Sequence, residues 1–159
     1  MKAAEIVERL RVMYGPRPRV RAVAPMSKVF IPEFRIGTGY GKNNEQRLDA
    51  WAMELTDKMV RRAFEVKVSR SDLLSELANP RKRARALLVS NEFWFATPPG
   101  LVKPDELPLE AGLIEVGQEG EWHVVEPAPW RDTPPPTWRF VASLIRRTEP
   151  VHPAPEEQD

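Results

Sequence analysis

Cysteine is absent from this chain of 159 residues, and histidine occurs only twice. The absence of thiols excludes disulfide bonds and thiolate metal sites. His123 and His152 lie far apart in late, proline-flanked segments, which argues against a histidine-based zinc site. Any metal ion would therefore be bound by carboxylate or carbonyl oxygens and by water, the ligands that hard divalent cations prefer.

Long apolar runs are also missing. No stretch approaches the roughly 18 to 20 apolar residues that a membrane-spanning helix needs. The first residues, MKAAEIVERL, carry charges within a predicted amphipathic helix and lack the apolar centre of a signal peptide. We therefore expect a soluble, cytoplasmic protein with no membrane partner.

Charge is distributed unevenly along the chain, although the formal net charge is only +1. Residues 1–95 contain 19 Lys/Arg and 11 Asp/Glu, whereas residues 96–159 contain 5 and 12. A basic first part with an acidic second part favours an anionic partner for the first part. By composition alone, a solvated surface of arginines explains the asymmetry equally well.

Hydrophobic periodicity predicts an α/β (α+β) fold. A stripe of apolar residues predicts a first helix over Ala3–Met13, and Ser71 is predicted to cap the helix that follows the third strand. Strands are predicted over residues 28–37, 47–55, 63–69, 92–100, 111–117 and 121–127, and further helices over 72–77, 81–90 and 137–147. This order predicts a mixed β-sheet of about five to six strands flanked by helices.

Proline separates the end of the chain from the rest. Eight of the 17 prolines fall within residues 127–155. We therefore predict an α/β domain over residues 1–126 and a proline-rich extension over residues 127–159, with one short helix and a disordered last dozen residues. Trp130 and Trp138 are the predicted anchors of this extension on the core.

Two predicted strands bring charged side chains together. In the stretch FEVKVSRSDLLSEL, Glu65 and Lys67 alternate with apolar residues and share the polar face of a strand. In the preceding strand, the alternation assigns one face to Leu48, Ala50 and Ala52 and the other face to Asp49, Trp51 and Met53. Because strands close in sequence usually pair, we expect Asp49 beside Glu65 and Lys67.

This grouping has a chemical interpretation and a structural one. Two carboxylates on neighbouring strands can share a divalent cation, and a lysine beside them can help to deprotonate water and stabilise developing negative charge. Such an arrangement suits hydrolysis of an anionic phosphodiester. The simpler alternative is a surface ion pair of Glu65 and Lys67, worth about 0–1 kcal/mol.

The same stretches resemble a known nuclease core. RLDAWAM followed by FEVKVSRSDLLSEL is similar to the D…(D/E)-x-K core of the PD-(D/E)XK nuclease superfamily, which has the restriction-endonuclease-like fold. The more specific resemblance is to its MmcB-like DNA-repair branch, through IPEF, RLDA, EVKVSRSD and ATPPGLVKPDELPLEAGLIEV. It extends from about Val29 to Val116. The proline of the superfamily's name is absent, because Leu48 precedes Asp49.

The resemblance implies a DNA nuclease that depends on Mg²⁺ or Mn²⁺ and acts in DNA repair or phage DNA metabolism. Asp49 and Glu65 would be metal ligands together with the backbone carbonyl of Val66, and Lys67 would be the catalytic lysine. The alternative is a catalytically silent protein of the same fold that binds DNA or a protein partner. Nucleases of this fold often act as dimers, so a homodimer is possible.

The resemblance leaves a further acid open. Glu33, near the end of the first strand, matches an acidic position of the branch and would join the catalytic residues. The superfamily more usually draws this acid from the first helix, which here offers Glu5 or Glu8. Asp72 matches the branch as well, and its position at a helix start explains it equally well.

Basic residues provide a candidate DNA-binding surface. The stretch RKRAR places four cations within five residues, and further arginines precede the third strand. Such cations bind phosphates without reading sequence. The predicted DNA-binding residues are Arg61, Arg62, Arg81, Lys82 and Arg85.

Overall fold

The computed structural model describes residues 1–17, 27–37 and 46–147. The predicted disordered end lies outside these residues.

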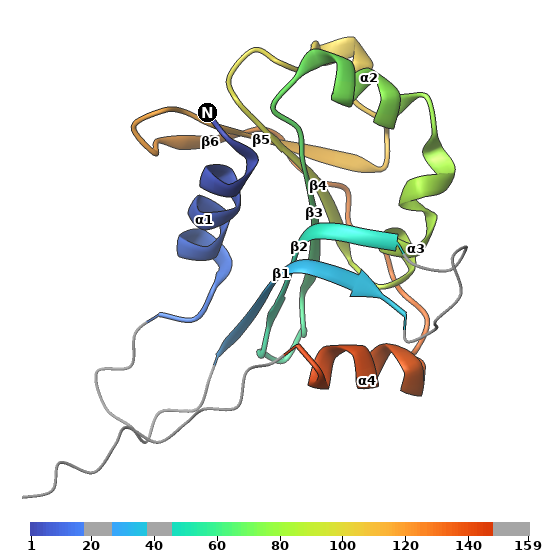
Figure 1. The fold of residues 1–159 in the computed structure, drawn as a ribbon. Coiled ribbons are helices and arrows are strands. Elements are labelled where there is room, and N and C mark those ends of the chain that lie inside the picture. Colours follow the sequence, from blue (N-terminus) through green and yellow to red (C-terminus); the bar gives the residue numbers. More distant parts are fainter. Residues whose placement is uncertain (18–26, 38–45, 148–159) are drawn as a thin grey trace, which may run out of the picture.

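One sheet of six strands forms the centre of the molecule (Figure 1). Neighbouring strands in the sheet follow the order of the chain. The strands are β1 (Lys28–Ile36), β2 (Gln46–Glu54), β3 (Arg61–Val66), β4 (Glu92–Thr97), β5 (Ala111–Val116) and β6 (Trp122–Glu126). β1, β2 and β3 pair antiparallel, β3, β4 and β5 pair parallel, and β6 is antiparallel to β5. The predicted mixed sheet is confirmed.

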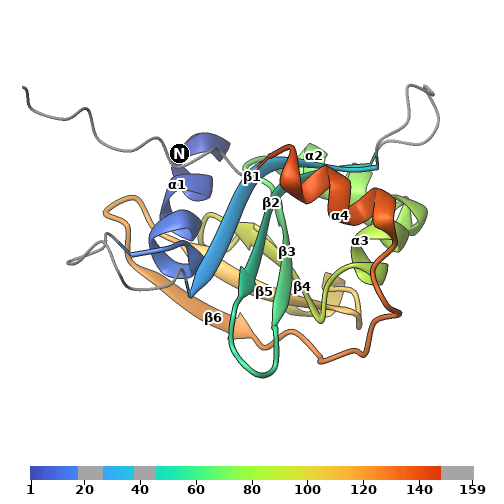
Figure 2. The same cartoon turned by 90° about the horizontal axis from the view of Figure 1, so that it is seen from below.

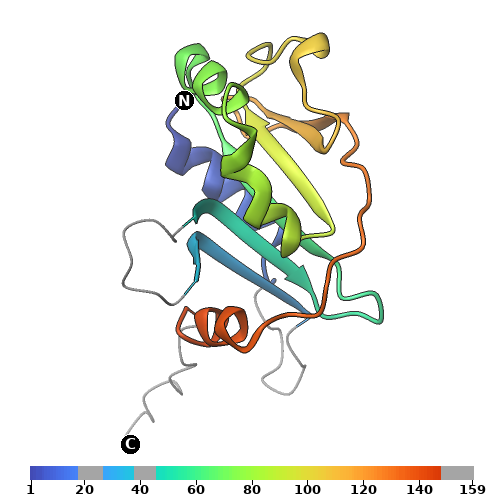
Figure 3. The ribbon, with the colours of Figure 1, turned by 90° about the vertical axis from the view of Figure 1, so that its right-hand side faces the viewer.

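Helices cover both faces of this sheet. They are α1 (Ala3–Tyr14), α2 (Arg70–Leu77), α3 (Ala84–Leu88) and α4 (Trp138–Ile145), with 3₁₀ turns over Pro80–Arg83 and Pro104–Glu106. Figures 1 and 3 show α1 on one face and α2 and α3 on the other, and Figure 2 shows α4 beside β1. None of the described helices is long and apolar enough to cross a membrane.

Two apolar cores lie on opposite faces of the sheet. In β4, Phe93 and Phe95 belong to the core shared with α2, α3 and α4, whereas Trp94 belongs to the core shared with α1. Ile6 and Leu10 of α1 are fully buried in this second core. Because β4 has a parallel neighbour on each side and helices on both faces, its sequence is an almost continuous apolar run.

β2 does not keep one alternation along its whole length. Leu48 packs in the same core as Trp51, whereas Ala50 packs in the other core. The predicted grouping of Leu48 with Ala50 is therefore wrong. The reversal occurs next to Asp49, where the pairing of β1 with β2 is interrupted. Opposite Asp49, Glu33 has a φ of 48°, a left-handed conformation that breaks the regular pleat.

The helix after β3 begins earlier than predicted. Ser69, and not Ser71, is the N-cap of α2, and its Oγ accepts a hydrogen bond from the N–H of Asp72 at 3.3 Å. Ser71 lies in the first turn, with its Oγ 3.3 Å from that of Ser69. Both serines satisfy the general preference for a capping hydroxyl, so the residue type alone did not distinguish them.

The proline-rich segment packs against the sheet as far as the structure describes it. The side-chain amide of Asn91 donates a hydrogen bond to the backbone carbonyl of Arg131, and the backbone N–H of Arg131 donates to the carbonyl of Asn91, each at 3.0 Å. In α4, Phe140 packs edge-on against two aromatic rings of the core. The predicted anchors, Trp130 and Trp138, are both exposed. Phe140 is therefore the residue that anchors this segment.

The packing of α4 leads to a prediction about stability. Phe140→Ala is expected to lower the free energy of unfolding by about 3 kcal/mol, because it removes a buried ring from the core. Trp138→Ala is the matched control on the same helix, and its exposed ring predicts a change below about 0.5 kcal/mol. Urea denaturation followed by circular dichroism measures both. Equal stability of the two variants would contradict the packing of α4 on the sheet.

Candidate functional site

The carboxyl end of β3 carries the candidate site. Glu65 lies on β3, and Lys67 directly follows its last residue, Val66. β3 runs parallel to β4, and the chain leaves β3 for α2 at this point. The N–H of Lys67 donates to the Ala96 carbonyl of β4 at 3.2 Å. This hydrogen bond fixes the backbone of Lys67 at the edge of the site.

Asp49 reaches the site from β2. The backbone pairing of β2 with β3 ends at Ala50 and Phe64. Beyond that pair, the N–H of Val66 donates to Oδ2 of Asp49 at 2.7 Å. An oxygen of the Asp49 side chain thus takes the place of a backbone carbonyl as the acceptor. This hydrogen bond holds the Asp49 carboxylate next to the residue of β3 that precedes Val66, which is Glu65.

The Lys67 ammonium has two carboxylate partners. Its Nζ lies 2.7 Å from Oε1 of Glu65 and 3.6 Å from Oε2 of Glu76. Glu76 belongs to α2 and is only 5% exposed. The side chains of Glu65 and Lys67 are each 14% exposed. The pair is therefore more buried than the simple surface ion pair considered above.

Burial and mutual repulsion change the protonation of these groups. Burial and the neighbouring charge of Asp49 raise the pKa of Glu65 to about 7, although Lys67 opposes the shift. Burial also raises the pKa of Asp49 against the hydrogen bond from Val66. Burial lowers the pKa of Lys67, but the surrounding carboxylates, Glu65 above all, raise it by more. The lysine therefore stays an ammonium group.

The donor set fits a hard divalent cation. Mg²⁺ prefers oxygen ligands and often uses only one or two carboxylates, because it keeps several waters. Asp49 and Glu65 would supply carboxylates, and Val66, at the same strand end, would supply a carbonyl. Glu76 is a third carboxylate nearby, and its partners are the ammonium groups of Lys67 and Lys82. Within the described residues, no three His, Cys, Asp or Glu side chains lie close enough to hold a metal together. A cation held by Asp49 and Glu65 would complete its coordination with water.

The three candidates for an additional acid lie in different surroundings. Glu33 is opposite Asp49, but its side chain is 68% exposed and pairs with Arg47 at 2.5 Å. Glu33 and Asp49 also line a groove of about 660 Å³ between α1 and β1. Glu5 accepts a hydrogen bond from the N–H of Lys2, the residue before α1, and Glu8 forms an ion pair with Arg11 within α1. Only Glu33 of the three shares the lining of this groove with Asp49.

Three of the predicted DNA-binding cations lie after α2. The Nζ of Lys82 is 3.8 Å from Oε2 of Glu76, and the Lys82 side chain is half exposed. Arg81 precedes it in the same 3₁₀ turn and is exposed, whereas Arg85 on α3 is half-buried. Lys82 therefore brings exposed positive charge next to the candidate site.

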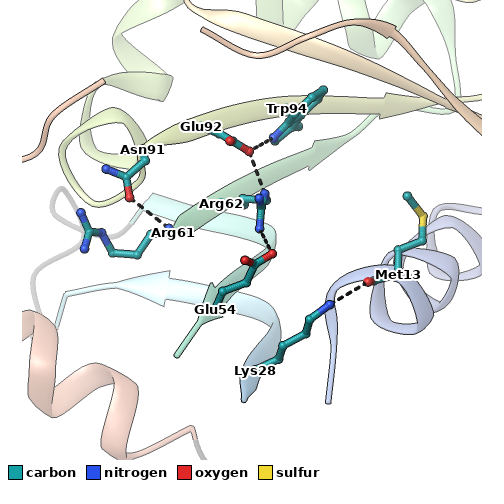
Figure 4. Close-up of polar contacts among 8 residues, drawn as sticks. All are labelled: Met13, Lys28, Glu54, Arg61, Arg62, Asn91, Glu92 and Trp94. Atoms are coloured by element: carbon teal, nitrogen blue, oxygen red, sulfur yellow. Dashed lines mark hydrogen bonds and ion pairs between the residues drawn. The ribbon is translucent and has the colours of Figure 1, made fainter. Parts of the chain in front are cut away.

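Arg61 and Arg62 lie at the other end of β3 (Figure 4). Arg62 pairs with Glu54 at 2.6 Å and with Glu92 at 2.7 Å, and its guanidinium lies over the ring of Tyr14. Arg61 donates hydrogen bonds to two neighbouring loops. A contact of Arg62 with a DNA phosphate would therefore compete with ion pairs that join three strands of the sheet.

Glu76 is the residue of this site that the sequence pattern missed. Leu73, Glu76 and Leu77 follow the i, i+3, i+4 spacing of a buried helical stripe. Leu73 and Glu76 are buried and Leu77 packs against the core, whereas Leu74 is 47% exposed. A carboxylate in the middle of an apolar stripe is the signal that could have identified it.

Comparisons with known proteins bear on the fold alone. No family model matches the chain, and no curated protein matches it at a significant level. Among solved structures, the chain is similar to SPO1766, a protein of unknown function from Silicibacter pomeroyi, with a TM-score of 0.57 and 20% sequence identity. The match covers 92% of this chain and 89% of that one. At this identity the likeness shows a shared fold, and membership of the nuclease superfamily stays a prediction.

Glu65 leads to a pH-dependent prediction for the metal-free protein. Its pKa of about 7 exceeds the ordinary value of 4.5, so the stability gained by protonating it is present at low pH and is lost as the pH rises through 7. Glu65→Gln mimics the protonated side chain. We expect this variant to match the wild type at pH 5 and to be more stable by about 1–3 kcal/mol at pH 8. Urea denaturation in the presence of a chelator measures the free energy of unfolding of the wild type and of the variant at each pH. The same difference between the two proteins at pH 5 and at pH 8 would contradict the raised pKa.

Proposed function

We propose that this chain is a DNA nuclease that depends on Mg²⁺ or Mn²⁺ and hydrolyses phosphodiester bonds in DNA repair or phage DNA metabolism. The observation that supports the proposal best is the half-buried grouping of Asp49, Glu65 and Lys67. Burying ionised groups is costly, and apolar residues of similar size often stabilise a fold equally well. Such a grouping is therefore better explained by chemistry than by stability.

The positions of these residues suggest their roles. Asp49 and Glu65, with the carbonyl of Val66, would hold the cation. When bound, the cation would neutralise phosphate charge and lower the pKa of water so that hydroxide is available near neutral pH. Lys67 would orient the attacking water and stabilise the negative charge that develops on the phosphate oxygens.

Exposed cations beside the site support DNA as the substrate. Arg81 and Lys82 follow α2, and such side chains bind phosphates without reading sequence. The same cations would also serve the second candidate function, a protein of this fold that binds DNA without cutting it. The two candidates differ only in whether the bound DNA is cleaved.

Cleavage of DNA by purified variants tests the proposal. Lys67→Met and Asp49→Asn are each expected to lower Mg²⁺-dependent cleavage by at least about 100-fold, because each removes a group from the reacting centre. Asp57→Asn, which removes an exposed carboxylate on the turn between β2 and β3, is the control and should retain activity. Single-stranded, duplex and branched DNA should each be assayed.

Folded wild-type protein that cleaves none of these substrates with Mg²⁺ or Mn²⁺ would overturn the nuclease proposal. Retained DNA binding in that case would favour the second candidate.

The cations next to the site lead to a separate prediction about binding. Replacing Arg81 and Lys82 together by Gln is expected to weaken DNA binding and to reduce the slope of log K against log salt concentration by about 1 to 2, since each phosphate contact contributes about 0.9. Lys58→Gln, on the exposed turn between β2 and β3, is the control and should change neither. Fluorescence anisotropy over a range of salt concentrations measures the slope. An unchanged slope in the double variant would remove both residues from the interface.

A further inference from the structure

α2 brings a third carboxylate to the candidate site, and the proposed chemistry does not use it. The Oε2 of Glu76 lies 3.6 Å from the Nζ of Lys67 and 3.8 Å from the Nζ of Lys82. The side chain of Lys67 is 14% exposed, whereas that of Lys82 is 52% exposed. Water screens the exposed lysine more strongly. Lys67 is therefore the main partner of the buried Glu76 carboxylate.

The helix that carries Glu76 is held at both ends. The carbonyl of Glu76 accepts a hydrogen bond from Nη1 of Arg83 at 3.1 Å. Arg83 is 3% exposed and pairs with Glu110 at 2.9 Å. At the first turn of α2, Arg70 forms a two-pronged ion pair with Glu106. A charged group on such a fixed element can hold a partner in a defined position.

Lys67 has one short contact and one longer contact. Its ammonium is 2.7 Å from Glu65 and 3.6 Å from Glu76. A divalent cation bound by Glu65 would repel an ammonium group that contacts the same carboxylate. Glu76 offers that ammonium a second carboxylate after only a small displacement.

We propose that Glu76 is a positioning residue that receives the Lys67 ammonium when Glu65 binds the cation. This inference rests on the proposed function and explains how one carboxylate can serve the cation while the lysine stays in the site. Without Glu76, Lys67 would remain on Glu65 and compete with the cation, or would turn to solvent.

A double-mutant cycle tests this role through Mg²⁺ binding rather than activity. Calorimetric titration of the full chain with Mg²⁺ alone compares Glu76→Gln in the wild-type and Lys67→Met backgrounds. In the wild-type background, Glu76→Gln is expected to weaken Mg²⁺ binding about tenfold, a size typical of coupling between contacting groups. In the Lys67→Met background, where no ammonium has to move, the same change is expected to weaken it by about twofold or less.

The control and the outcomes separate this inference from the proposed function. Asp57→Asn removes an exposed carboxylate on the turn between β2 and β3 and should leave Mg²⁺ affinity unchanged. Equal weakening by Glu76→Gln in both backgrounds would overturn the inference alone, because Glu76 would then act on the cation without Lys67. If the folded wild type binds neither Mg²⁺ nor Mn²⁺, the proposed function fails and the inference fails with it.

Lysine reactivity in the wild type gives a second measurement that needs no variant at Glu76. Reductive methylation and mass spectrometry compare Lys67 with the exposed Lys58, with and without saturating Mg²⁺. We expect Lys67 to remain much less reactive than Lys58 in Mg²⁺, because Glu76 retains its ammonium. A rise of Lys67 to the reactivity of Lys58 on adding Mg²⁺ would overturn the inference even if Glu76→Gln does not fold.

Discussion

The hydrogen bond from the Val66 N–H to the Asp49 carboxylate determines how the sheet and the candidate site fit together. The pairing of β2 with β3 ends at Ala50, the residue after Asp49, and a backbone N–H in a buried strand needs an acceptor. Asp49 supplies it at 2.7 Å, directly opposite the left-handed Glu33 that interrupts the pairing of β1 with β2. The requirement to satisfy one backbone group therefore brings the Asp49 carboxylate toward Glu65 in spite of their repulsion.

The resulting acidic pair is unfavourable for a protein without a bound cation. Burial and the charge of Asp49 together outweigh the attraction of Lys67, so the pKa of Glu65 stays near 7 rather than returning to its ordinary range. Buried ionic groups of this kind seldom add net stability. Sites that carry out chemistry often lower the stability of the protein that contains them, and the proposed function would account for this arrangement in that way.

The sequence predicted the regular parts of this arrangement. Glu65 and Lys67 were expected on one face because β3 keeps a simple alternation, and their 2.7 Å contact agrees with it. Leu48 was placed on the wrong face, because the reversal depends on the backbone of Glu33 in a different strand. Glu76 was not predicted, because its burial depends on which face of α2 meets the sheet. Local patterns thus predicted the elements and the grouping of Asp49, Glu65 and Lys67, and tertiary contacts decided the burial of Glu76 and the face of Leu48.

The charge asymmetry of the sequence also depends on tertiary contacts. Arg70 pairs with Glu106, and Arg83 pairs with Glu110, so acidic residues of the second part neutralise two arginines of the first part. The first ion pair joins α2 to the segment before β5, and the second joins the 3₁₀ turn after α2 to the same segment. Arg83 also donates to the carbonyl of Glu76, so both pairs help to hold the helix that carries Glu76. The acidic part of the chain is thus an internal partner of the basic part. The composition therefore overstates the positive charge that is available to an anionic partner, and the exposed cations after α2 are a better guide than the total.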